Sequence, residues 1–127
     1  MPVDPTGADL KRYLAEDPGG EVVMLNLLKF KPEGRPSYEQ YAQEITRFLD
    51  ELGASIVYLG DCLTSLVERP EGFDWDAILL VRYPSRQAFS SMVANPKYQE
   101  ITHMRTESLE EAVLQATIPW PSSPTGE

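Results

Sequence analysis

The chain has 127 residues, 42% of them hydrophobic, which suffices for one domain with its own buried core. Its 20 acidic and 11 basic residues give a formal net charge of -9, which repels phosphate backbones, so we expect no nucleic-acid binding. The longest apolar run, Val22–Leu25, is too short to cross a bilayer, and the first residues lack the pattern of a secretory signal. Cys62 is the only cysteine and suits a reducing compartment. We therefore expect a cytoplasmic protein without membrane partners.

The first half of the chain predicts a helix, a strand and a longer helix. Residues 6–14 are typical of a short helix, which Pro18, Gly19 and Gly20 end. Glu21 to Lys31 is almost continuously apolar, which indicates a strand buried on both faces. Ser37 and Gln40 then resemble a capping box at a helix start. Apolar residues follow at three- and four-residue steps up to Leu52, and Gly53 is placed to end this helix.

The second half predicts two strands, helical segments and a last strand. Ala54 to Val67 is typical of a strand that bends near Gly60 or Asp61. A turn over residues 69–73 leads to a strand over residues 75–83. Ser85 begins a helix, Asn95 and Pro96 begin helix again, and Glu110 to Ile118 alternates as a fourth strand does.

This order, β-α-β-β-α-β after a short preamble, predicts an α+β fold in which a four-stranded antiparallel sheet carries both helices on one face. We expect residues 1–20 to form an N-terminal extension with a possible short helix, residues 21–118 the domain, and residues 119–127 an irregular tail. The strands are apolar on both faces, so the face without helices needs a cover. A second copy of the chain is the simplest cover, which predicts a homodimer through the open sheet face.

The sequence resembles the domain-of-unknown-function-1330 family, within the dimeric α/β-barrel superfamily. The likeness extends from about Val22 to Ile118, whereas the longer N-terminal segment and the run Asn26–Lys31 depart from it. It is carried by Tyr38, Tyr41, Gly53, Gly60, Tyr83-Pro84-Ser85, Ala88-Phe89, Asn95-Pro96-Lys97-Tyr98 and Arg105. The resemblance implies a ferredoxin-like fold and a dimer, and it implies no particular activity.

Polar residues on the predicted core faces are the candidate ligand-binding groups. Asn26 interrupts an apolar strand face, and a buried amide left unpaired costs about 1–3 kcal/mol. It either donates to a ligand oxygen or satisfies a backbone carbonyl. Tyr38 and Tyr41 lie on the apolar stripe of their helix, and Tyr58 alternates with Ile56 on the second strand. Their rings favour packing, and their hydroxyls could edge a pocket between helix and sheet.

Three residues are candidate catalytic groups. Arg82 and Arg105 could each hold an anion, or each could pair with one of the many acids. His103 is the only histidine and could act as a general base or, as in haem-degrading relatives of the superfamily, as a haem ligand. Helical spacing turns His103 away from Tyr98, Ile101 and Met104, so we expect a solvent-facing side chain and no haem.

The sequence predicts no cofactor and no metal, because one histidine and one cysteine give no zinc pattern. Two hypotheses remain for function. The chain is a small cofactor-free enzyme, similar to monooxygenases or isomerases, in which Asn26 orients an oxygen and an arginine fixes negative charge. Alternatively it is a non-catalytic dimeric module that binds a small organic molecule or serves a structural role. The two differ in whether His103 and the arginines lie within a concavity.

Overall fold

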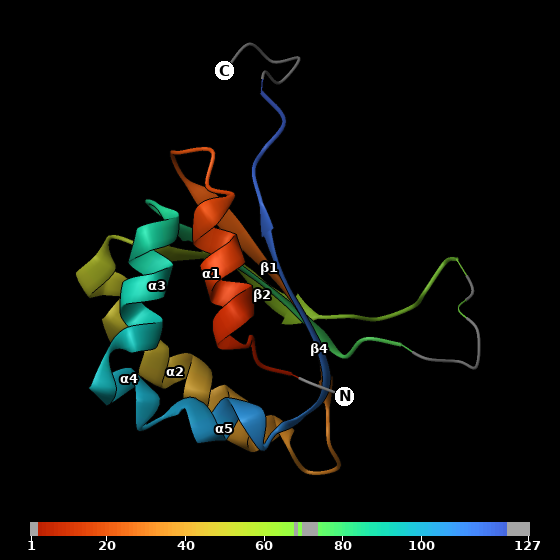
Figure 1. Cartoon of the computed structure of the whole chain (residues 1–127). Coiled ribbons are helices and arrows are strands. Elements are labelled where there is room, and N and C mark those ends of the chain that lie inside the picture. Colours follow the sequence, from red (N-terminus) through yellow and green to blue (C-terminus); the bar gives the residue numbers. More distant parts are fainter. Residues whose placement is uncertain (1–2, 68, 70–73, 122–127) are drawn as a thin grey trace.

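The computed structural model describes residues 3–67, 69 and 74–121 as one sheet covered by helices (Figure 1). Figure 1 shows the helices on one side of the sheet, with the opposite face uncovered. The elements in chain order are α1 (Gly7–Ala15), β1 (Val22–Phe30), α2 (Arg35–Leu52), β2 (Ser55–Asp61), β3 (Ala77–Tyr83), α3 (Arg86–Ala94), α4 (Pro96–Gln99), α5 (Thr102–Thr106) and β4 (Leu109–Thr117).

The four strands lie in the order β2-β3-β1-β4, and every neighbouring pair is antiparallel. This order places the first and third strands at the centre, as a βαββαβ chain requires when both crossovers are right-handed. The predicted α+β fold, a four-stranded antiparallel sheet with helices on one face, is confirmed.

The two central strands divide their side chains between a helix-covered face and an open face. On β1 and β3 every second residue is buried, beginning with Val22 and Ala77. The alternate residues, among them Leu25, Leu27 and Leu80, lie on the open face and are only half-buried. The sheet is therefore apolar on both faces, but one face alone has a cover within the chain.

Helix α2 is the main cover of the sheet. Its buried residues are Tyr38, Tyr41, Ile45, Phe48 and Leu49. Gly53 ends the helix with φ of 71°, and its N–H donates to the carbonyls of Leu49 and Asp50. Glycine adopts this left-handed conformation without steric cost, which explains the predicted stop.

The start of α2 differs from the predicted capping box. The helix begins at Arg35, with Gly34 as the cap and no side-chain capping bond. Pro36 fits the first turn because its missing N–H has no partner there in any case. The hydroxyl of Ser37 instead donates to the Met104 carbonyl at 3.1 Å, which ties α2 to α5.

The β2–β3 hairpin is shorter than predicted. β2 ends at Asp61 rather than Val67, and most of the predicted turn over residues 69–73 lies outside the described residues. β3 begins at Ala77 rather than Trp75, because Asp76 forms hydrogen bonds with the end of β1. Its carboxylate accepts from the Phe30 N–H, and its own N–H donates to the Leu28 carbonyl, each at 2.8 Å.

The helical segment before β4 breaks in the middle. Ser85 and Asn95 cap α3 and α4 as predicted, accepting from Ala88 N at 3.1 Å and from Lys97 N at 2.9 Å. A turn at Glu100 and Ile101, whose backbone angles remain in the right-handed helical region, then separates α4 from α5. Tyr98, Ile101 and Arg105 are buried on both sides of this turn at three- and four-residue steps, so the inner face of the helical segment continues across it. Within the described part of the chain, no helix has the length and apolar character needed to span a membrane.

Candidate functional site

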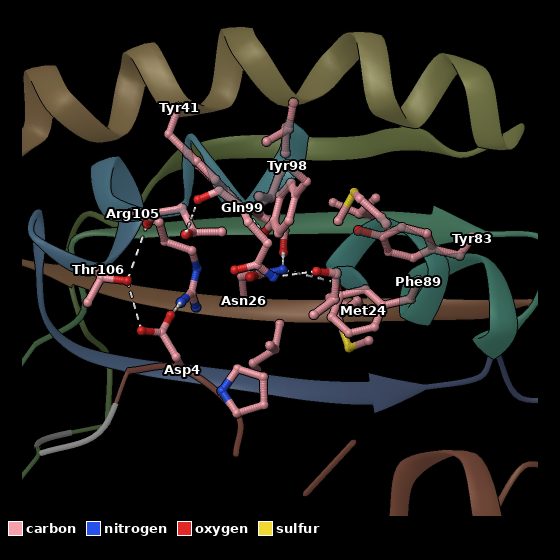
Figure 2. A pocket seen from close by; sticks show the side chains of 18 of the residues that line it. Asp4, Met24, Asn26, Tyr41, Tyr83, Phe89, Tyr98, Gln99, Arg105 and Thr106 are labelled. Carbon is pink, nitrogen blue, oxygen red and sulfur yellow. Dashed lines mark hydrogen bonds and ion pairs between the residues drawn. The ribbon is translucent and has the colours of Figure 1, made fainter. Parts of the chain in front are cut away.

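A cavity of about 240 Å³ lies between the helix-covered face of the sheet and the helices (Figure 2). Its wall includes residues of β1, β3 and β4 on the sheet side and residues of all five helices or the loops beside them. The apolar part of the wall consists mainly of Leu10, Met24, Ile45, Leu79, Val81, Phe89, Met92, Val93 and Leu114. An apolar cavity of about 150 Å³ binds benzene in other proteins. The space here therefore suits a compact molecule about the size of a substituted benzene ring.

Asn26 lies in the cavity wall, on the buried face of β1. Its side-chain Nδ2 donates to the carbonyl of Leu79 at 3.3 Å and to that of Met24 at 3.5 Å. Both distances exceed the usual range of 2.7–3.2 Å for a good N–H···O bond, so the amide is held weakly. Asn26 therefore has features of both predicted roles. Its amide donates to backbone carbonyls, and it also lies in the cavity wall.

Three tyrosines contribute hydroxyl groups to the wall. The hydroxyls of Tyr41 and Tyr98 lie 2.6 Å apart and form a buried hydrogen bond. The Tyr38 hydroxyl is buried without a partner among the described residues. Burial raises the pKa of Tyr38 to about 12 and that of Tyr41 well above its ordinary value. At neutral pH these tyrosines are therefore protonated hydrogen-bond donors rather than bases.

Arg105 is a charged residue whose side chain points into this space (Figure 2). Its side chain is almost completely buried. Nη1 donates to the Val3 carbonyl and to Asp4 Oδ1, each at 2.6 Å. Nη2 is buried without a partner among the described residues. The N-terminal segment thus neutralises the guanidinium and leaves one of its nitrogens unused.

The other three candidate residues lie away from the cavity. Tyr58 is opposite Leu80, on the open face of the sheet, and is 54% exposed. Arg82 is on the same face, where it pairs with Glu21 at 3.0 Å and donates to the Gly53 carbonyl at 2.9 Å. His103 is exposed on α5. The expected placement of Tyr58 beside the cavity is therefore corrected, and Arg82 and His103 have no contact with it.

A β-bulge explains the position of Tyr58. Ile56 is opposite Val81 on the covered face, but the register shifts between Ile56 and Tyr58. One extra residue on a strand moves everything beyond it to the other face. Strict alternation from Ile56 therefore puts Tyr58 on the wrong side.

Sequence reasoning identified neither Asp4 nor Tyr98 as part of the site. Asp4 lies in the N-terminal extension, and its carboxylate also accepts from the Thr106 hydroxyl at 2.8 Å. Nothing local in the sequence indicates a contact across about a hundred residues. Tyr98 stands in the segment that carries the family resemblance, which was the available signal. Among the described residues, no group of three or more potential metal ligands is found.

The two neighbouring tyrosines of α2 give a matched prediction. Tyr38→Phe removes an unpartnered buried hydroxyl, so we expect unchanged stability or a gain of about 1 kcal/mol. Tyr41→Phe leaves the Tyr98 hydroxyl without its partner, so we expect a loss of about 1–3 kcal/mol. Urea denaturation of both variants measures the difference. Equal destabilisation by the two substitutions would mean that the Tyr38 hydroxyl has a bonding partner.

A sheet with one helical layer, and a small cavity between the two layers, define an α+β protein of the ferredoxin-like type. A model of the domain of unknown function DUF1330 matches residues 26–116, and the chain belongs to this family. No curated protein matches the sequence.

Solved structures share the fold. RPA0582, a protein of unknown function from Rhodopseudomonas palustris, is 26% identical and has a TM-score of 0.85, over 94% of this chain and 98% of that one. A dimeric ferredoxin-like protein of unknown function from Jannaschia sp. CCS1 is 13% identical, with a TM-score of 0.60 over 79% and 100% of the chains. A hydroxynitrile lyase from Passiflora edulis is 15% identical, with a TM-score of 0.62 over 84% and 100%. The last two likenesses concern the fold alone.

Proposed function

We propose that the protein binds a compact, mainly apolar organic molecule in the cavity of each subunit of a cytoplasmic homodimer. The observation that carries this proposal is the mixture of groups in the cavity wall. Apolar side chains form most of it, while the Tyr38 hydroxyl and Arg105 Nη2 are buried there without partners. Buried polar groups are normally hydrogen-bonded, so unpartnered ones beside an open space favour a ligand as the partner.

The homodimer part of the proposal rests on the open face of the sheet. Leu25, Leu27, Ile78, Leu80 and Val113 lie there, only half-buried. The segment after β2 projects away from the helical layer (Figure 1), and its Leu63 and Leu66 are almost fully exposed. Apolar surface of this kind favours association, and a second copy covers both regions by symmetry. The similar protein from Jannaschia sp. CCS1 is described as dimeric.

An enzymatic role is the second candidate. Arg105 and Tyr38 offer donors that could stabilise an oxygen on which negative charge develops during a reaction. The predicted proton-transfer group, His103, is exposed and away from the cavity. Binding is therefore the function that the geometry supports best, and it remains the common requirement of both candidates.

Asn26→Leu tests the binding proposal. The substitution keeps approximate side-chain volume and removes two long hydrogen bonds, so we expect stability to change by less than about 1 kcal/mol. Affinity for a ligand in the cavity that hydrogen-bonds to the Asn26 amide is expected to fall about tenfold, the equivalent of one hydrogen bond. Thermal unfolding and calorimetric titration of ligands found in a fragment screen measure the two effects. A loss of about 3 kcal/mol of stability with unchanged ligand affinity would assign Asn26 a purely structural role.

A further inference from the structure

Two hydrogen-bond donors at the polar end of the cavity are buried without a partner among the described residues. Arg105 Nη2 and the Tyr38 hydroxyl have no acceptor among the described residues. The Tyr41 and Tyr98 hydroxyls bond to each other, which uses one of their two hydrogens and leaves the other available. A ligand that fits this end must therefore bring an acceptor oxygen, which is the group that a carbonyl or a carboxylate offers.

The charge at the polar end of the cavity decides whether the ligand's acceptor group is a neutral carbonyl or a charged carboxylate. Arg105 and Asp4 are the charged residues in the described wall of the cavity, and their Nη1 and Oδ1 atoms lie 2.6 Å apart. Thr106 donates to the other carboxylate oxygen at 2.8 Å and so fixes Asp4 in place. The positive charge is thus already balanced before a ligand arrives. A carboxylate ligand would add a second negative charge to one guanidinium in a buried space, which costs free energy.

We propose that the cavity selects a neutral ligand with a carbonyl-type oxygen, which accepts from Arg105 Nη2 and the Tyr38 hydroxyl, and that Asp4 determines the preference for neutral over anionic ligands. This inference rests on the proposed function and names the chemical class of the ligand. It also assigns the N-terminal extension a specific task, because Asp4 reaches the site from the segment that precedes α1.

Three probe molecules of similar size separate the contributions of hydrogen bonding and of ligand charge to the binding affinity. Acetophenone carries a neutral carbonyl, benzoate carries a carboxylate, and toluene carries neither. Calorimetric titration of the unmodified protein is expected to give the highest affinity for acetophenone, about a hundredfold above toluene for the two hydrogen bonds gained. Benzoate is expected to bind more weakly than acetophenone. Tyr38→Phe should lower the affinity for acetophenone about tenfold and leave that for toluene unchanged.

Asp4→Asn tests the charge directly, because the amide keeps the shape of the carboxylate and its oxygen can still accept from Arg105. We expect this variant to bind benzoate at least about tenfold more tightly than the unmodified protein, with little change for acetophenone. Asp50→Asn removes the same charge from an exposed position on α2 and is the matched control. Circular dichroism of both variants checks that the fold is retained.

Each alternative result has a defined meaning. Benzoate that binds the unmodified protein as tightly as acetophenone, or that binds Asp4→Asn no better, would overturn the assignment of a neutral ligand. Equal binding of toluene and acetophenone would show that water satisfies the donors, which leaves a small-molecule cavity but removes the carbonyl preference. If no probe binds any variant, both this inference and the proposed function fail.

Discussion

Leu80→Arg is expected to convert the proposed homodimer into a monomer, with the molar mass falling to the 14.3 kDa of the single chain. Leu80 lies on the open face of β3, one of the two central strands, and so within the proposed interface. Removing a leucine from an apolar interface costs about 1.5–3 kcal/mol, and two-fold symmetry doubles this loss. A buried, unpaired arginine adds a further cost. The dissociation constant should therefore rise at least about a hundredfold.

Light scattering coupled to size-exclusion chromatography measures this change at micromolar concentration. Gln43→Arg adds the same charge to the exposed face of α2 and is expected to leave the mass of the dimer unchanged. Circular dichroism must show that Leu80→Arg retains its secondary structure. A folded Leu80→Arg variant with the mass of a dimer would exclude the open face as the interface. An unmodified protein that is monomeric under these conditions would exclude the homodimer itself.

The fold is expected to be lost in alkaline solution, between about pH 11 and 13. Burial raises the pKa of Tyr41 and Tyr83 well above the ordinary value, and that of Tyr38 to about 12. In the unfolded chain tyrosines ionise near pH 10. The folded state therefore holds these protons more tightly, and its stability is fully present below about pH 10 and falls as the pH rises above it.

The expected size follows from proton linkage. Each of the three tyrosines removes about 1.4 kcal/mol of stability for every pH unit between its unfolded and folded pKa, or about 4 kcal/mol per unit together. The free energy of unfolding of a small domain is about 5–15 kcal/mol in total. Tyrosinate absorbance and circular dichroism should therefore change together in one steep transition. Tyr38→Phe should move its midpoint to higher pH. Ionisation of all tyrosines near pH 10 without loss of secondary structure would contradict the burial of these side chains.

The sheet and its helices could be predicted from the sequence because their signals are local. The apolar stripe of α2, the glycine after it and the caps Ser85 and Asn95 each depend on residues within one or two turns. Asn26 was recognisable as a polar residue in an apolar strand, and its position in the cavity wall follows from the same alternation.

The polar end of the cavity could not be predicted because it depends on irregular or distant features. The bulge before Tyr58 reverses the face on which that side chain lies. Asp4 meets Arg105 through a tertiary contact between the N-terminal extension and α5. Periodicity carries no information about either of these features, whereas helical spacing did predict the solvent-facing side of α5 on which His103 lies.

A crystal structure of the protein soaked with acetophenone is the most direct test of a ligand site between the sheet and the helices. The ketone is expected in the cavity of about 240 Å³, with its ring against Met24 and Phe89 and its oxygen within hydrogen-bond distance of Arg105 Nη2 or the Tyr38 hydroxyl. A ketone bound only elsewhere on the molecule, beside a cavity that remains filled by ordered water, would contradict this account.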